Sequence, residues 1–146
     1  HIMNAKAHDE LDQREAAIGT LEKYWQLGGF EPRVLHQLAD WLYDAGRSED
    51  AIAVLNDVIF VAPLDESLHT KLGDWLLENE LAAPALREYQ ALLAMDPYDK
   101  AAAHYRLATA YVQLEDEAKT REHLLYALET APHYREAQQL LLEILR

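Results

Sequence analysis

Three prolines at nearly equal spacing constrain the fold of this chain more than any other feature of its sequence. Pro63, Pro97 and Pro132 are 34 and 35 residues apart, and each follows a segment whose apolar residues have helical spacing. Proline disrupts the interior of a helix, so each of the three marks a helix end. A period of this length is typical of repeat proteins, in which each repeat buries the apolar face of its neighbour. The sequence therefore predicts a stack of similar repeats.

The repeats can be superimposed from the segments that begin at Pro32, Glu66 and Ala101. Within each segment, apolar residues recur at spacings of three, four and seven, which is the periodicity of an amphipathic helix. Each repeat is therefore predicted to consist of two helices joined by a tight turn. The eighth place always holds a small residue, which allows two helices to approach closely where they cross. These residues are Ala39, Gly73 and Ala108.

The residues between the paired helices predict how the turns are made. Gly46 is expected to end the first helix of its pair and Ser48 to cap the second, while Asn79 is expected to take the left-handed conformation in the next turn. Pro84 suits the first turn of its helix, where its missing N–H has no cost. The third turn, residues 115–117, has no glycine but places acidic groups at a helix N-terminus.

The repeated pattern resembles that of the tetratricopeptide repeat family. In order, it consists of Leu or His, Leu with a small residue, Leu or Tyr, Ala, a bulky residue and a final Pro. The resemblance covers Pro32 to Tyr134, with Thr120 in place of alanine and one extra residue before Ala101 as departures. It implies an all-α fold, a right-handed superhelix (α-solenoid) of three helix-turn-helix repeats with an N-terminal helix and a C-terminal capping helix. The expected boundaries are 4–31 for the N-terminal helix, 32–65, 66–100 and 101–134 for the repeats, and 135–146 for the capping helix.

The N-terminal helix has two interpretations. Ala17, Leu21 and Tyr24 lie where the second helix of a preceding repeat would place its small and bulky residues, but a simple capping helix accounts for them equally well. Gly28 and Gly29 are expected to end this helix. We interpret residues 1–3 as a vector remnant.

The resemblance also implies a concave binding groove lined by the first helix of each repeat. Helical spacing independently places Asp40 and Asp44 one turn apart, and likewise Asp74 and Glu78. Four carboxylates in one groove would favour a neutral or cationic peptide or helix; the alternative is that they are ordinary solvated carboxylates. The candidate groove residues are Arg33, His36, Asp40, Tyr43, Asp44, Thr70, Asp74, Leu77, Glu78, Tyr105, Arg106 and Thr109.

Some members of the family bind the acidic C-terminal tails of heat-shock chaperones through a clamp of Lys and Asn. The matching places here hold His36 and Asp40, then Lys71, then Ala102 and Arg106. Asp40 would repel a carboxylate ligand, so we do not expect this clamp.

Charge and composition exclude other classes of partner. The 146 residues carry 13 Lys and Arg against 26 Asp and Glu, a formal net charge of −13 at pH 7. Nucleic acids and anionic membranes recruit cationic proteins, so neither is an expected partner. The absence of cysteine excludes disulfides, thiolate nucleophiles and cysteine-ligated metals. We expect a protein or peptide partner; self-association through an apolar end of the stack is an alternative.

The histidines and tryptophans are assigned to packing. His36, His69 and His104 recur about once per period, but none has a second histidine four residues away, and His123 looks isolated in the sequence, as does His133. Trp41 and Trp75 occupy the same place in successive repeats, and we predict both to be core residues.

No catalytic motif accompanies the repeats, since the sequence has neither a phosphate-binding glycine loop nor a nucleophile elbow. The sequence therefore predicts a non-catalytic protein-interaction scaffold without metal or cofactor. The alternative is an accessory domain cut from a longer, enzymatic protein. Because the N-terminus lacks a basic region followed by an apolar run, we expect a soluble protein of the cytoplasm rather than an exported one.

Overall fold

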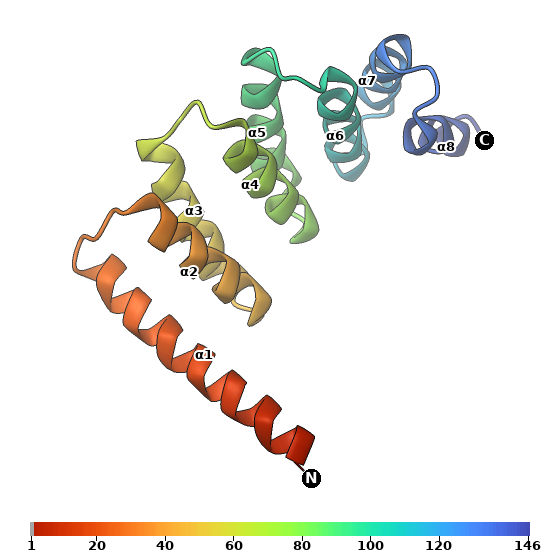
Figure 1. The fold of residues 1–146 in the computed structure, drawn as a ribbon. Coiled ribbons are helices and arrows are strands. Elements are labelled where there is room, and N and C mark those ends of the chain that lie inside the picture. Colours follow the sequence, from red (N-terminus) through yellow and green to blue (C-terminus); the bar gives the residue numbers. More distant parts are fainter. Residues whose placement is uncertain (1) are drawn as a thin grey trace. The chain divides into compact units, whose positions relative to one another are not determined.

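A computed structural model describes the backbone of residues 2–146 and the side chains of residues 10–146. Every regular element in this part of the chain is a helix, and Figure 1 shows the helices in chain order. None of the described helices is both long and apolar enough to cross a bilayer. The helices are α1 (Ile2–Gln26), α2 (Pro32–Asp44), α3 (Ser48–Val61), α4 (Glu66–Glu78), α5 (Ala82–Ala94), α6 (Lys100–Gln113), α7 (Glu117–Thr130) and α8 (Arg135–Ile144).

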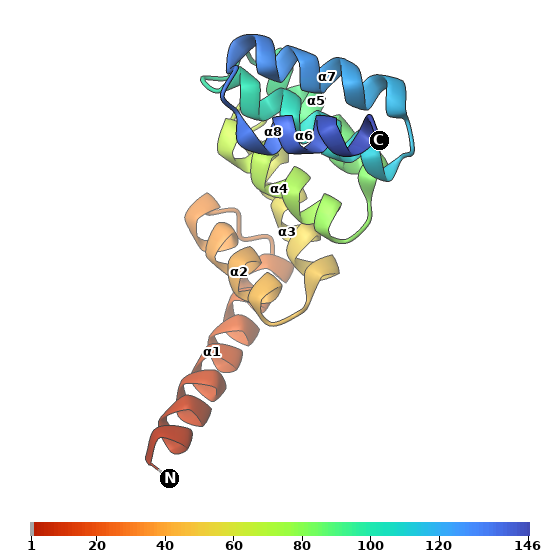
Figure 2. The ribbon, with the colours of Figure 1, turned by 90° about the vertical axis from the view of Figure 1, so that its right-hand side faces the viewer.

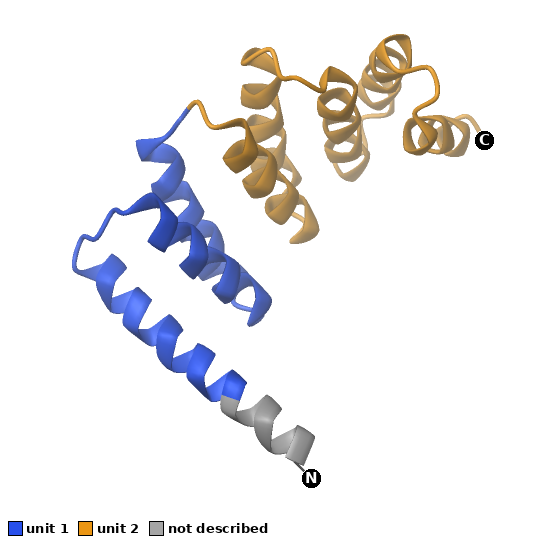
Figure 3. Cartoon of the chain, viewed as in Figure 1, with its two compact units in different colours: residues 1–63 blue, residues 64–146 orange. Residues whose placement is uncertain are grey.

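The helices form three pairs between an N-terminal and a C-terminal helix, which confirms the predicted fold class. The pairs are α2 with α3, α4 with α5, and α6 with α7, and the members of each pair pack on one another. The chain divides into two compact units, residues 1–63 (unit 1) and residues 64–146 (unit 2), shown in Figure 3.

Unit 1 contains α1, α2 and α3. The α2–α3 pair buries its apolar faces, including Leu38 and Leu55, which have no exposed surface. Polar contacts join the C-terminal half of α1 to α3 and its N-terminal end: Trp25 Nε1 donates to Asp57 Oδ2 at 2.6 Å, and the Arg47 guanidinium donates to both carboxylate oxygens of Glu22 at 2.8 Å. The end of α1 is thus held to the first helix pair at two separate points.

Unit 2 contains α4 to α8. Leu72 of α4 and Leu107 of α6 are almost completely buried. A further cluster joins three helices, with Ala108 of α6, Leu124 of α7 and Ala137 of α8 at its centre. Figure 2 shows α8 lying alongside α6 and α7. The last helix therefore covers the apolar face that the α6–α7 pair would otherwise expose.

The small residues of the eighth place lie where the paired helices cross. Ala39 and Ala108 have no exposed surface, and Gly73 is buried. A Cβ atom added at Gly73 would collide with the ring of Tyr89 on α5. The absence of a side chain on α4 is therefore what makes room for a large ring from its partner helix.

The turns within the three pairs share one geometry. In each, the residue after the C-cap has a positive φ: Gly46 at 81°, Glu80 at 62° and Glu115 at 58°. In the first turn, Arg47 N–H donates to the Leu42 carbonyl and Gly46 N–H to the Tyr43 carbonyl. Equivalent bonds recur in the other two turns, so all three are Schellman motifs.

Two cap predictions were wrong. Asn79 has a φ of −99°, and the left-handed residue is the following Glu80. Ser48 is the first residue of α3, and the N-cap is Arg47, whose side chain makes no capping bond. The side chain of Asn79 instead donates to the Trp75 carbonyl at 2.7 Å, which satisfies a helix-end acceptor without a change in φ.

Aspartates cap the helices of unit 2. Asp65 accepts hydrogen bonds from the amides of Ser67 and Leu68 at the start of α4. Asp99 and Asp116 cap α6 and α7 in the same way. A carboxylate at a helix N-terminus is stabilised by the unpaired amides and by the helix dipole. The acidic group predicted at the third turn is thus confirmed.

Replacing Gly73 by leucine tests the helix crossing. The added side chain must displace the Tyr89 ring, so Gly73→Leu is expected to lower the free energy of unfolding by about 1–3 kcal/mol. Chemical denaturation measures this. Gly19→Leu is the matched control, because a Cβ at Gly19 on α1 meets nothing within 4 Å. Equal stability of the Gly73→Leu variant and the wild type would contradict the crossing geometry.

The two glutamates with positive φ predict stabilising substitutions. A left-handed conformation costs a residue with a Cβ about 1–2 kcal/mol, and a glycine at the same place avoids this cost. Glycine also loses more conformational entropy on folding, which offsets part of the gain. Glu80→Gly is therefore expected to raise the free energy of unfolding by about 0.5–1 kcal/mol. Gly46→Ala, at the equivalent turn of unit 1, should change it in the opposite direction. A thermal melt that falls for Glu80→Gly would show that Glu80 is not left-handed.

Candidate functional site

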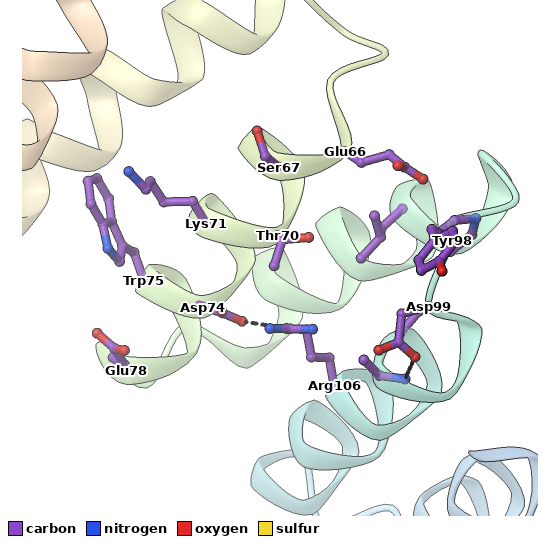
Figure 4. A pocket seen from close by; sticks show the side chains of 14 residues that line it. Glu66, Ser67, Thr70, Lys71, Asp74, Trp75, Glu78, Tyr98, Asp99 and Arg106 are labelled. Carbon is purple, nitrogen blue, oxygen red and sulfur yellow. Dashed lines mark hydrogen bonds and ion pairs between the residues drawn. The ribbon is translucent and has the colours of Figure 1, made fainter. Parts of the chain in front are cut away.

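A cleft with a volume of about 630 Å³ lies between α4 and α6 of unit 2. The α4 residues that line this cleft recur at spacings of three and four residues, so they lie on one face of the helix in successive turns. The opposite wall comes from α6 and from the loop before it, and Figure 4 shows the labelled side chains around the cleft. The lining includes Glu66, Ser67, Thr70, Lys71, Asp74, Trp75 and Glu78 from α4, Tyr98 and Asp99 from the loop, and Ala102, Ala103 and Arg106 from α6.

A second cleft of about 280 Å³ adjoins the first and shares Asp74, Glu78 and Arg106 with it. It continues past Tyr134, at the start of α8. We call the two clefts together the α4–α6 groove. The structure brings together on this groove the predicted residues of unit 2, which are Thr70, Asp74, Leu77, Glu78, Tyr105, Arg106 and Thr109.

Asp74 joins three helices at the floor of the groove. The Tyr89 hydroxyl, from α5, donates to Asp74 Oδ1 at 2.6 Å, and Arg106 Nε, from α6, donates to the same oxygen at 3.1 Å. Burial, followed by the hydrogen bond to Asp74, raises the pKa of Tyr89 above its ordinary value. Tyr89 therefore stays a donor at any physiological pH. Asp74, which the sequence suggested as a ligand-facing carboxylate, is thus engaged in holding α4, α5 and α6 together.

The groove has more acidic than basic groups. Glu66, Asp74, Glu78 and Asp99 line it, against Lys71 and Arg106. Because Asp74 and Arg106 pair with each other, the remaining excess of negative charge comes from Glu66, Glu78 and Asp99. Such a surface attracts cationic groups and repels carboxylates.

Aromatic rings lie at two places on the same groove. Trp75 is 9% exposed, as expected for a core residue, yet it also lines the cleft, with the Lys71 ammonium 5.6 Å from its ring. Tyr98 is fully exposed at the rim. Tyr98 is not among the candidate groove residues that the sequence predicts. The signal that could have found it is the extra residue in its loop, which displaces the chain from the regular repeat.

The predicted residues of unit 1 all lie on α2. Asp44 is exposed, whereas His36, Asp40 and Tyr43 are half-buried. Arg33 lines a different cleft, of about 570 Å³, between α1 and α2. That these α2 residues line one common groove with the predicted residues of unit 2 stays a prediction.

Trp41 also lines the α1–α2 cleft, together with Leu21 and Val34. Its ring is half-buried, and the Arg14 guanidinium lies 5.8 Å from the ring centre. Trp41 is therefore less enclosed than its repeat equivalent Trp75 and less of a core residue than the sequence predicted.

Two histidines that are far apart in the sequence meet between α6 and α7. His104 Nδ1 and His123 Nδ1 are 3.0 Å apart, and the two rings are stacked. Tyr126 packs on His104 and Tyr111 on His123. The description of His123 as isolated was therefore wrong. Burial lowers the pKa of both imidazoles, with a further contribution from Lys100 for His104.

The same pair of repeat positions holds different chemistry in each repeat. In the second repeat, His69 Nδ1 is 2.6 Å from Glu88 Oε2, and His69 is buried. In the first, the equivalent residues Leu35 and Val54 are both buried. Each pair is 19 residues apart, so the contact of His69 with Glu88, once known from the structure, leads to His104 and His123 through the repeat register. Among the residues whose side chains are described, no three or more His, Cys, Asp or Glu residues are grouped to hold a metal ion.

Comparisons with known proteins identify the fold. No model of a protein family matches the chain, and no curated protein matches it. Among solved structures, a double mutant of MamA is 23% identical, with a TM-score of 0.75 over 98% of this chain and 81% of that one.

Two further structures are proteins with tetratricopeptide repeats. YrrB, "a TPR protein with an unusual peptide-binding site", is 20% identical, with a TM-score of 0.73 over 92% of this chain and 69% of that one. The first such domain of Spaghetti (RPAP3), bound to the HSP90 peptide SRMEEVD, is 19% identical, with a TM-score of 0.68 over 78% of this chain and 90% of that one. At these identities the likeness shows the fold alone.

The role of Asp74 can be tested by substitution. Asp74→Ala leaves the hydroxyl of Tyr89 without its acceptor and is expected to lower the free energy of unfolding by about 1–2 kcal/mol. Tyr89→Phe should cost about 0.5–1.5 kcal/mol, and the double variant less than the sum, since the two residues share one interaction. Asp44→Ala, at an exposed position, is the control. Additive losses in chemical denaturation would show that the Tyr89–Asp74 bond contributes nothing.

Proposed function

We propose that this chain, which has the tetratricopeptide-repeat fold, is a non-catalytic protein-interaction scaffold that binds a peptide or helix of a partner protein. The observation that carries the proposal is the α4–α6 groove, in which residues from two repeats and the loop between them line adjoining clefts. Solved structures of the same fold include one bound to a peptide and one described by its peptide-binding site, which supports a groove of this kind as a binding surface.

The charge of the groove favours a neutral or cationic segment. A ligand lysine or arginine would meet Glu66, Glu78 or Asp99, and its apolar neighbours would contact Trp75 and Tyr98. Aromatic side chains give large contact area at small entropic cost, so they are well suited to this role.

An acidic tail suits the groove poorly. The peptide SRMEEVD, which the domain of RPAP3 binds, carries three acidic side chains. In this chain, Arg106 is paired with Asp74, and the remaining excess of charge along the groove is negative. Both features support the expectation from Asp40 that this chain lacks a carboxylate clamp.

A selection from a random library of displayed peptides tests the proposal. We expect the selected sequences to be enriched in lysine, arginine and aromatic residues. Synthetic peptides of the strongest sequences are then titrated against the full chain, with binding followed by fluorescence anisotropy. Glu78→Lys and Tyr98→Ala should each weaken binding by about tenfold, equivalent to about 1.4 kcal/mol. Glu78→Lys should also reduce the dependence of affinity on salt, because one attractive charge becomes repulsive.

Glu129→Lys is the matched control, since Glu129 is exposed on α7 and lines none of the described clefts of the groove. It makes the same change of net charge away from the groove. If Glu129→Lys and Glu78→Lys weaken binding equally, the effect is one of net charge, and the α4–α6 groove is not the binding site. Enrichment of acidic peptides would contradict the proposed ligand class.

A further inference from the structure

The Nδ1 atoms of His104 and His123 are within hydrogen-bond distance, and this separation is also the one that two imidazole ligands of a single metal ion would have. Zn²⁺ binds imidazole nitrogen at about 2.0–2.1 Å, and other divalent first-row ions prefer similar donors. Two such bonds at angles between square and tetrahedral place the nitrogens about 2.9–3.4 Å apart. His104 Nδ1 and His123 Nδ1 are 3.0 Å apart. We propose that His104 and His123 bind a divalent transition-metal ion of the Ni²⁺, Cu²⁺ and Zn²⁺ class between α6 and α7.

The surroundings favour imidazoles that are ready to bind metal. A metal ligand must be a neutral imidazole, and burial lowers the pKa of both rings, which favours the neutral form. Tyr111 stacks on the His123 ring, and Tyr126 lies tilted against both imidazoles, so these contacts restrict the orientation of the two rings. Both rings are half-buried rather than enclosed, which leaves the pair accessible to an ion from solvent.

The nearby charges are mixed. Lys100 and Lys119 disfavour a cation near the pair, whereas Glu122 favours one. Lys119 Nζ lies 3.3 Å from Glu122 Oε2, so these two charges largely offset each other. With two protein ligands, the remaining coordination positions are left to water or to a group from a partner. The site therefore binds metal weakly and exchangeably, unlike a structural zinc site with four ligands.

The equivalent positions of the other repeats do not form such a site. Leu35 and Val54 have no ligand atoms. His69 and Glu88 approach to 2.6 Å, closer than two ligands of one ion, and the His69 side chain is only 8% exposed. That contact is a charge-assisted hydrogen bond rather than an open pair of ligands. The proposed site is thus a property of the third repeat.

The test uses the full chain and Ni²⁺ alone as probe, at pH 7.5, with binding measured by isothermal titration calorimetry. The matched variant carries His104→Leu and His123→Val together. It installs the Leu and Val that the first repeat has at these positions, so the helix pair is expected to fold, which circular dichroism and thermal melting check. We expect this variant to bind Ni²⁺ at least about tenfold more weakly than the wild type.

His133→Asn is the control, since His133 is exposed and is outside the pair. It should leave Ni²⁺ binding unchanged. NMR provides an independent readout, because bound paramagnetic Ni²⁺ should broaden the ring signals of His104 and His123 before those of His36. Equal Ni²⁺ affinity of the folded double variant and the wild type would overturn the proposal, and so would broadening that begins at other histidines.

Discussion

The close crossing of paired helices is the constraint on which the rest of unit 2 depends. Gly73 has no side chain, so the ring of Tyr89 can lie directly against α4. This position brings the Tyr89 hydroxyl to Asp74, and the same carboxylate oxygen receives Arg106 from the next repeat. A packing requirement within one helix pair thereby fixes a polar contact between two repeats. The floor of the α4–α6 groove is a consequence of that crossing.

The repeats share a backbone but not a chemistry. The positions occupied by Leu35 and Val54 in the first repeat hold His69 hydrogen-bonded to Glu88 in the second and two stacked imidazoles in the third. The helix pair folds with each of these combinations because the small eighth-place residue and the large apolar residues around it are retained. Positions that do not set the crossing are free to acquire binding functions, and the proposed metal site is one such case.

The negative charge of the chain has more than one role. Asp65, Asp99 and Asp116 satisfy the free amides at helix starts, and Asp57 accepts a hydrogen bond from α1. These carboxylates stabilise the fold and are only partly available to a ligand. The proposed preference of the groove for a cation thus rests on a few groups that line it, Glu78 among them, rather than on the net charge of −13.

The sequence by itself determined the helix pairs and the small residues at their crossings, whereas the candidate groove residues came from the resemblance to a repeat family. The helix pairs follow from periodicity along each helix, because spacings of three, four and seven residues define a face without reference to any other element. The sequence also suggested a left-handed residue in the second turn, but it selected Asn79 where the backbone places Glu80. Residue preferences alone do not locate the left-handed position to a single residue, because the conformation of the turn is set by both helices that it joins.

Only the tertiary structure decided which side chains meet across helices. The pairs His104 with His123, Asp74 with Arg106, and Trp25 with Asp57 join residues 19, 32 and 32 positions apart. Their contacts depend on the offset and rotation of one helix against another, and periodicity along a single helix contains neither quantity. The face of each helix was therefore readable from the sequence, whereas the chemistry at the contacts between faces was set by packing.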